Sequence, residues 1–200
     1  SPYIIESSKK LLTMMGIPYI EAYGEGEAQA AYIVENGDAW AVASQDYDCL
    51  LFGAKRVVRN LAINSNLGDL EYYNLKRVLD ELDINREQLI DMGILIGTDF
   101  SEGLKGVGAK TALKLAKKGE LENKLAKLQE ESSHDISEVR EIFLNHNVNT
   151  DYKIRWKKPA KNDIIDFLCE EHGFSQDRVS KACDKLKNLN SSQKSLEDWF

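Results

Sequence analysis

The sequence has no long apolar run and is poor in cysteine and histidine. No apolar segment approaches the ~20 residues of a transmembrane helix, and we find no signal peptide, so we expect no membrane association. The three cysteines are odd in number and lack metal-motif spacing, which indicates reduced thiols in an intracellular protein. The three histidines are scattered through polar segments, where surface or capping positions are expected rather than catalysis.

One segment also lacks positive charge. Residues 19–54 contain seven acidic residues and no Lys or Arg, which equals the net charge of −7 of the whole chain. The other residues therefore sum to zero, and their basic residues are concentrated in two stretches, 101–119 and 153–161. A net acidic chain ordinarily argues against a nucleic-acid partner, because such partners select basic surfaces. This uneven distribution instead predicts one acidic site and two basic surfaces.

The apolar pattern predicts an α/β fold whose second half is helical. Helices alternate with short apolar strands as far as Tyr73, which indicates a sheet covered by helices, and later segments have helical periodicity. Asn74 and Asn85 are placed to cap the first two later helices. The expected strands are 18–20, 40–43, 56–58 and 70–73, and the expected helices are 5–15, 27–34, 75–82, 86–96, 111–118, 121–129, 161–172 and 176–187.

Four carboxylates follow the ends of these elements. Glu25 and Glu27 begin a helix, and Asp46 and Asp48 follow the strand 40–43. If the chain stays extended there, both aspartates project to one side, at the sheet edge where open α/β folds place their sites. Carboxylates without a nearby cation repel one another, and a bound Mg²⁺ or Mn²⁺ would remove this repulsion. The alternative is a solvated acidic surface, with the glutamates favoured by the helix dipole.

Asp99 adds a fifth carboxylate. It follows an apolar helical stretch that ends at Gly97. A role as N-cap of the next helix is an equally good interpretation of this aspartate when it is considered alone.

The segment 104–112, LKGVGAKTA, matches the hairpin of a helix-hairpin-helix motif. Two glycines around one apolar residue allow a tight turn with exposed backbone N–H groups, which can hold a phosphate at the start of a helix. Such contacts hold the DNA backbone without reading its sequence. A helix cap with a solvated lysine face is the alternative. The residues expected to bind DNA are Lys105, Gly106, Gly108, Lys110, Thr111 and Lys114.

Together these motifs resemble the flap endonuclease family of structure-specific 5′ nucleases, of the XPG/Rad type. The resemblance covers essentially all of the chain and is carried by the strings 21–31, 43–53, 97–100 with 105–108, and 167–175 with 177–179. It implies a PIN-like α/β nuclease core with two Mg²⁺ ions, which Mn²⁺ can replace, and a K⁺ ion at the glycine hairpin. The catalytic and metal-binding residues that it implies are Glu25, Glu27, Asp46, Asp48 and Asp99.

The same resemblance implies a division into domains. Residues 1–98 would be the later half of the nuclease domain, 99–187 a helical DNA-binding region with an H2TH-type hairpin motif at 101–118, and 188–200 a linker and tail. Family members begin with a segment that supplies more aspartates, sheet strands and a helical arch. Nothing here matches that segment, so we expect an incomplete core, a longer natural protein and no activity for this chain alone.

The last eight residues resemble the peptide that docks on the sliding clamp PCNA. One helical turn would place three apolar side chains on one face as anchors for a groove. A tail packed on its own domain is the alternative. The expected clamp-binding residues are Gln193, Leu196, Trp199 and Phe200.

These expectations combine into a monomeric 5′ flap endonuclease that is recruited by PCNA. It would hydrolyse branched or flap DNA near the junction of single and double strands by two-metal-ion catalysis, in Okazaki-fragment maturation and repair. Its compact tail looks more archaeal than eukaryotic, which implies the cytoplasm or nucleoid rather than a nucleus. Two alternatives stay open: a non-catalytic DNA- and clamp-binding module, or another member of the same 5′ nuclease superfamily.

Overall fold

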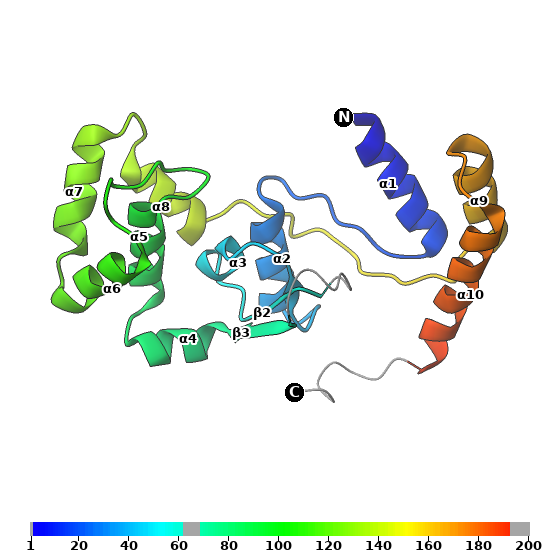
Figure 1. Cartoon of the computed structure of the whole chain (residues 1–200), viewed down its shortest axis with the longest axis horizontal. Coiled ribbons are helices and arrows are strands. Elements are labelled where there is room, and N and C mark those ends of the chain that lie inside the picture. The colour runs from blue at the N-terminus through cyan, green and yellow to red at the C-terminus, as the bar shows by residue number, and fades with distance from the viewer. Residues whose placement is uncertain (1, 62–68, 193–200) are drawn as a thin grey trace. The chain divides into compact units, whose positions relative to one another are not determined.

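The computed structural model describes residues 2–61 and 69–192, with side chains described as far as residue 186. Contacts within the chain divide it into two units (Figure 1). Unit 2 is the continuous stretch 22–149, whereas unit 1 combines residues 1–21 with those from Thr150 onward. These units follow contacts, while the domain boundaries after residues 98 and 187 follow sequence motifs and stay a prediction.

Unit 2 contains a small mixed sheet. Its strands lie in the order β1-β2-β3, with β1 parallel to β2 and β3 antiparallel to β2. The parallel pair is joined through α3, and α2 packs against both β1 and α3. The bounds of these elements are α2 Gly26–Glu35, β1 Val42–Ala43, α3 Asp48–Leu51, β2 Arg56–Arg59 and β3 Glu71–Asn74.

The rest of unit 2 is helical, as the periodicity predicts, and it includes one helix, at residues 136–144, that was not among those expected. The central helix α5 packs against α3, α6, α7 and α8, and Ile90, Ile94 and Leu95 on it are fully buried. Both predicted caps are confirmed: Asn74 accepts from the Arg77 amide, and Asn85 forms a capping box with Gln88. The bounds of these helices are α4 Leu75–Leu82, α5 Arg86–Ile96, α6 Ala109–Lys118, α7 Leu121–Glu131 and α8 Ile136–Leu144.

Aromatic packing joins the two parts of unit 2. Phe143 of α8 is fully buried, and its ring centroid lies 4.9 Å from that of Phe52 and 5.6 Å from that of Phe100. Phe52 directly follows α3, and Phe100 directly follows Asp99. The buried Phe143 ring therefore packs against both segments that carry candidate aspartates.

Unit 1 is formed by helices from the two ends of the chain. Ile164, Val179 and Cys183 form its buried centre, and Leu11 and Met15 pack against them. The predicted helix 161–172 changes to a π-helix after Ile165. The bounds are α1 Pro2–Met15, α9 Lys161–Ile165, η1 Asp166–Glu171 and α10 Gln176–Ser192.

Two strand predictions need correction. Residues 18–20 are irregular rather than extended in a sheet, and the strand predicted at 40–43 is reduced to Val42–Ala43. In the described chain no strand pairs with Pro18–Ile20. The apolar content of these residues could not reveal this, because strand formation depends on the neighbours with which a segment packs. Among the described residues, no helix combines the length and the hydropathy needed to cross a membrane.

A buried ion pair lies among the helices of unit 2. Asp91 of α5 is only 3% exposed, and Arg140 of α8 donates from Nη2 to its Oδ2 at 3.0 Å. Arg140 Nε also lies 2.9 Å from Asp91 Oδ1. Burial raises the pKa of Asp91 to about 6, although Arg140 acts in the opposite direction.

We expect Asp91 to make the free energy of unfolding depend on pH. The native state binds its proton more tightly than the unfolded state does, so its contribution is complete below pH 3.8 and is lost as the pH rises through about 6. The loss is at most about 3 kcal/mol, at ~1.4 kcal/mol per pKa unit. Asp91→Asn should flatten this part of the profile, which urea unfolding across that range measures. An unchanged profile in the variant would contradict the assignment to Asp91.

Candidate active site

Asp46 and Asp48 lie in a turn, so the predicted extended continuation of β1 is wrong. The Asp48 amide donates to Asp46 Oδ1 at 3.0 Å, and the Asp46 amide donates to Ser44 Oγ at 3.1 Å. Tyr47 between them has helical dihedral angles, and Asp48 is the first residue of α3. Aspartate commonly stabilises such a turn, because its side chain accepts from the amide two residues later. The turn still leaves the Asp46 carboxylate exposed and that of Asp48 half-buried.

Helix α2 carries Glu25 and Glu27 at its start. Glu25 occupies the N-cap position but its side chain accepts no capping hydrogen bond, and Glu27 lies in the first turn. The Glu25 carboxylate is therefore not used to cap the helix.

Gln29 fixes this end of α2 and was not found from the sequence. It is 3% exposed, its Nε2 donates to the Asn149 carbonyl at 2.9 Å, and its Oε1 accepts from the Asn149 amide at 2.7 Å. The one feature of the sequence that could have indicated this role is that a polar glutamine lies among the alanines of residues 28–31.

Asp99 lies at the tip of a short turn between Thr98 and Ser101. The two residues exchange backbone hydrogen bonds of 2.9 and 3.2 Å. Ser101 is 4% exposed and donates from Oγ to the carbonyl of Ile94 in α5 at 3.2 Å, which anchors the turn. Asp99 caps no helix, because α6 begins at Ala109 with Gly108 as its N-cap. No pattern in the sequence indicates the anchoring role of Ser101.

The fold places the other four candidate carboxylates near enough to Asp48 for their negative charges to act on it. Burial and the negative charges of Asp46, Asp99, Glu27 and Glu25 together raise the pKa of Asp48 to about 6. All five residues belong to unit 2. The turn after β1, the start of α2 and the turn after α5 thus all lie near Asp48, and a shared metal-binding role for these carboxylates stays a prediction.

The donor set fits a hard divalent cation, but its geometry is not that of a complete metal site. Carboxylate oxygens are the ligands that Mg²⁺ and Mn²⁺ prefer. Within residues 2–61 and 69–192, however, no group of three or more His, Cys, Asp or Glu side chains is gathered closely enough to hold a metal ion. Mutual repulsion keeps carboxylates apart where no positive charge lies between them.

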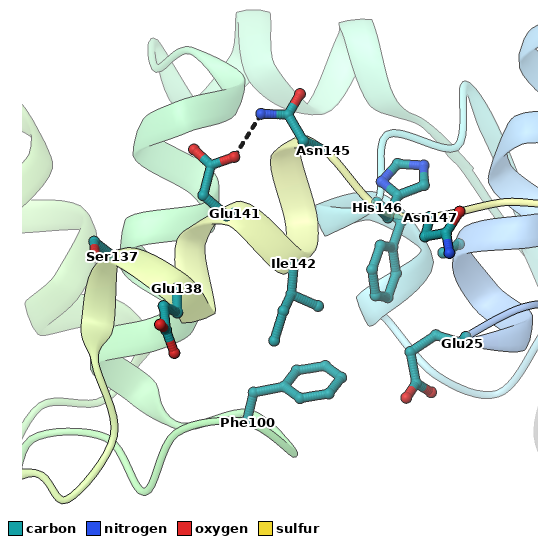
Figure 2. A pocket seen from close by; sticks show the side chains of 12 residues that line it. Glu25, Phe100, Ser137, Glu138, Glu141, Ile142, Asn145, His146 and Asn147 are labelled. Carbon is teal, nitrogen blue, oxygen red and sulfur yellow. Dashed lines mark hydrogen bonds between the residues drawn. The ribbon is translucent and has the colours of Figure 1, made fainter.

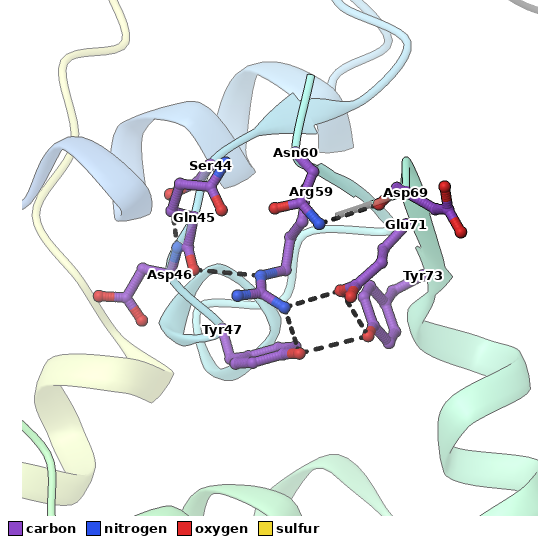
Figure 3. A network of polar contacts seen from close by, with 9 residues as sticks. All are labelled: Ser44, Gln45, Asp46, Tyr47, Arg59, Asn60, Asp69, Glu71 and Tyr73. Carbon is purple, nitrogen blue, oxygen red and sulfur yellow. Dashed lines mark hydrogen bonds and ion pairs between the residues drawn. The ribbon is translucent and has the colours of Figure 1, made fainter. Parts of the chain in front are cut away.

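A polar network holds Tyr47, the residue between the two aspartates (Figure 3). Arg59 of β2 donates from Nη1 to the Tyr47 hydroxyl and lies 2.7 Å from Glu71 Oε2. Its guanidinium also lies 4.0 Å from the Tyr47 ring centroid. The Tyr73 hydroxyl donates to Glu71 at 2.9 Å and lies 3.3 Å from the Tyr47 hydroxyl.

This network has two consequences for the candidate site. The hydrogen bond to Tyr47, burial and Glu71 raise the pKa of Tyr73 to about 12, so that the phenol stays protonated and can donate. Arg59 is engaged by Glu71 and Tyr47, and it therefore orients the turn rather than neutralising Asp46 or Asp48. The sequence could not reveal this, because Arg59 and Glu71 are brought together only by the β2–β3 register.

A cavity of about 520 Å³ lies beside Glu25 (Figure 2). Phe52, Phe100 and Ile142 line it with apolar atoms, while Glu138 and Glu141 of α8 add carboxylates. Asn145 donates to Glu141 at 2.5 Å across one side. Three carboxylates on one cavity repel phosphate groups, so this cavity is an unfavourable place for a DNA backbone.

The glycine hairpin forms the turn that its sequence predicts. Gly106 has a left-handed φ of +84°, and the Val107 amide closes a turn to the Leu104 carbonyl at 3.0 Å. Gly108 then starts α6 without a side-chain cap. The amides of residues 109–111 find no acceptor in the part of the chain that is described, and these three residues are exposed.

The lysines of this region are on the surface, and their binding of DNA stays a prediction. Lys105, Lys110 and Lys114 are exposed, as is Thr111, and no carboxylate of the described residues pairs with the three lysines. The predicted clamp-binding residues Gln193, Leu196, Trp199 and Phe200 lie outside the described residues.

Comparison with known proteins agrees with this architecture. Residues 16–99 match the XPG I-region, and this stretch contains all five candidate carboxylates. The chain is 99% identical over 200 residues to flap endonuclease 1 of Methanobrevibacter smithii, and it spans 61% of the length of that relative.

Solved structures show the same fold. Flap endonuclease-1 from Methanococcus jannaschii matches with a TM-score of 0.86 and 43% identity, over 96% of this chain and 60% of that one. The catalytic core of Rad2 in complex with DNA substrate matches with a TM-score of 0.77 at 21% identity, over 93% of this chain and 68% of that one. The small sheet and its helices thus have the fold of part of an α/β nuclease, and residues 16–99 are similar to the XPG I-region of such proteins.

Proposed function

We propose that the chain is part of a metal-dependent 5′ flap endonuclease that acts near the junction of single- and double-stranded DNA. The observation that carries this proposal is the convergence of five carboxylates on half-buried Asp48, in a chain 99% identical to a flap endonuclease 1. The expected reaction is phosphodiester hydrolysis, as part of DNA replication and repair. Divalent cations, when bound, would activate water and stabilise the leaving oxygen.

The residues of the chain have separate tasks in this proposal. Asp48 and the four carboxylates that face it would hold two Mg²⁺ ions, which Mn²⁺ can replace. The DNA backbone would be held by the amides of residues 109–111, at the start of α6, and by the exposed Lys110 and Lys114. A K⁺ ion at Gly106–Gly108 would add positive charge beside the phosphates. Arg59 and Gln29 would keep the carboxylate-bearing segments in position.

The test of this proposal compares branched DNA substrates. The 200-residue chain, and a chimera that adds the remainder of the Methanobrevibacter smithii relative, are incubated with 5′-flap, nicked and four-way-junction DNA, with and without Mg²⁺. We expect the chimera to cleave the flap substrate near its junction only with the metal. Preferred cleavage of the four-way junction would instead assign the chain to a junction-resolving member of the superfamily.

A second candidate function is a non-catalytic DNA-binding module. The observation that favours it is that the carboxylates of the described residues are not gathered at metal-binding distances. In the same experiment, DNA binding by both proteins with no Mg²⁺-dependent cleavage by either one would select this function.

Binding to the PCNA clamp is proposed from the sequence of residues 193–200 alone. Deleting them should abolish binding to the clamp, because the aromatic anchors are lost. Isothermal titration of the clamp with the intact and the shortened chain measures this, with flap DNA binding as the control for folding. An affinity that survives the deletion would refute the proposal.

A further inference from the structure

The second basic stretch of the sequence has no task in the proposed reaction. Its central part, Lys153–Lys158, is an extended segment of unit 1 that carries four cations among six residues (Figure 1, before α9). Lys153, Arg155, Lys157 and Lys158 are all exposed. None of these four side chains has a carboxylate partner among the described residues.

The same segment displays an uncovered aromatic ring. Trp156 is 68% exposed. Within the described chain no other ring and no cation is stacked on it, whereas Trp40 is stacked on Tyr72 and lies beneath Arg56. Tryptophan is enriched at interfaces, because its ring offers a large apolar surface for contact and its N–H can stay paired with a polar group. Here the ring is flanked by positive charge on both sides in the sequence.

The backbone of this segment is held in place. The Lys157 amide donates to the Gly16 carbonyl at 2.9 Å, and the Ala160 amide donates to the Met14 carbonyl at 2.8 Å. The approach to Gly16 is so close that a Cβ there would lie 2.1 Å from the Lys157 carbonyl oxygen. These contacts hold the backbone at the C-terminal end of the segment, next to Trp156, which lowers the conformational entropy lost on binding.

We propose that Lys153–Lys158 binds single-stranded nucleic acid, with a base stacked on Trp156 and the backbone phosphates held by the four cations. Cations beside an exposed aromatic ring are the combination that single-strand binding surfaces use. Duplex DNA offers the cations phosphates but keeps its bases stacked inside, and an acidic peptide without aromatic residues offers no flat ring to stack on Trp156. The inference goes beyond the proposed function, because it requires neither the carboxylate cluster nor a divalent cation.

The experiment measures binding without cleavage. Fluorescence anisotropy of labelled oligo-dT and of a blunt duplex is recorded with the 200-residue chain in EDTA, at two salt concentrations. Trp156→Ala should weaken oligo-dT binding about 5- to 100-fold, as expected for the loss of one stacked base, and duplex binding much less. The double variant Lys157→Glu/Lys158→Glu should weaken binding and reduce its dependence on salt.

Matched variants separate these effects from general changes in charge or folding. Tyr3→Ala removes another exposed ring of unit 1, and Lys76→Glu/Lys127→Glu makes the same change of charge in unit 2. Both should leave oligo-dT binding unchanged, and circular dichroism checks folding. Equal binding of oligo-dT by Trp156→Ala and the unmodified chain would overturn the proposal. The proposal would also be overturned if the duplex bound as tightly as oligo-dT and lost as much affinity in Trp156→Ala. Displacement of oligo-dT by polyglutamate would overturn it too.

Discussion

Asp48→Asn is expected to abolish Mg²⁺-dependent flap cleavage by the chimera while it stabilises the metal-free chain. Loss of one carboxylate at the centre of the cluster should weaken metal-assisted transition-state stabilisation by several kcal/mol, which corresponds to a decrease in rate of roughly 10²-fold or more. The same change removes a half-buried charge that faces four others, so the unfolding midpoint of the 200-residue chain should rise. Single-turnover cleavage and thermal unfolding measure the two effects.

Glu130→Gln is the matched control for this variant. Glu130 is exposed on α7, away from the candidate carboxylates, so this substitution should change neither cleavage nor stability measurably. Flap DNA binding should survive in both variants, because the hairpin and its lysines are untouched. Unaltered cleavage by the Asp48→Asn chimera would remove Asp48 from the active site.

Gly103→Ala is expected to destabilise unit 2 more than any other single methyl addition proposed here. Gly103 has a φ of +71°, and a Cβ there would lie 2.5 Å from the Ile96 carbonyl oxygen and 2.7 Å from the Gly97 nitrogen. Both contacts are with backbone, which cannot rotate away. Strain and overpacking together should cost about 3–5 kcal/mol, measured as a decrease in the urea midpoint.

Gly106→Ala adds a methyl group at another glycine with a positive φ, but without the steric contact. Its φ is +84°, but nothing lies within 4 Å of the added Cβ. This variant should lose only about 1 kcal/mol, the cost of the left-handed conformation. Equal losses for the two variants would show that conformation, rather than the close approach of Gly103 to α5, determines stability here.

The helical half of the fold could be predicted well because its signals are local. Asn74 and Asn85 cap helices that begin where the sequence places them, and the apolar spacing of α5 gives its ends correctly. The sheet was harder to predict, because strand pairing depends on residues distant in sequence. Residues 18–20 have strand-like composition but no partner strand in the described chain.

The candidate site also has one part that could be predicted from the sequence and another that could not. Its carboxylates could be named from their spacing, whereas the Asp46–Asp48 turn, the Ser101 anchor and the Arg59–Glu71–Tyr47 contacts could not. These features depend on hydrogen bonds between side chains and distant backbone or on the β2–β3 register, neither of which leaves a periodic pattern in the sequence. Chemistry-bearing residues are therefore easier to predict than the residues that orient them.

The construction of unit 1 from both ends of the chain has a consequence during biosynthesis. Unit 2 is continuous and can complete its core as it leaves the ribosome, whereas α1 must wait for α9 and α10. At ~5–20 residues per second, that delay is on the order of ten seconds. Throughout it the apolar side chains of Leu11, Met14 and Met15 lack the partners that later cover them. Nascent α1 is thus the segment on which we expect chaperones to act longest.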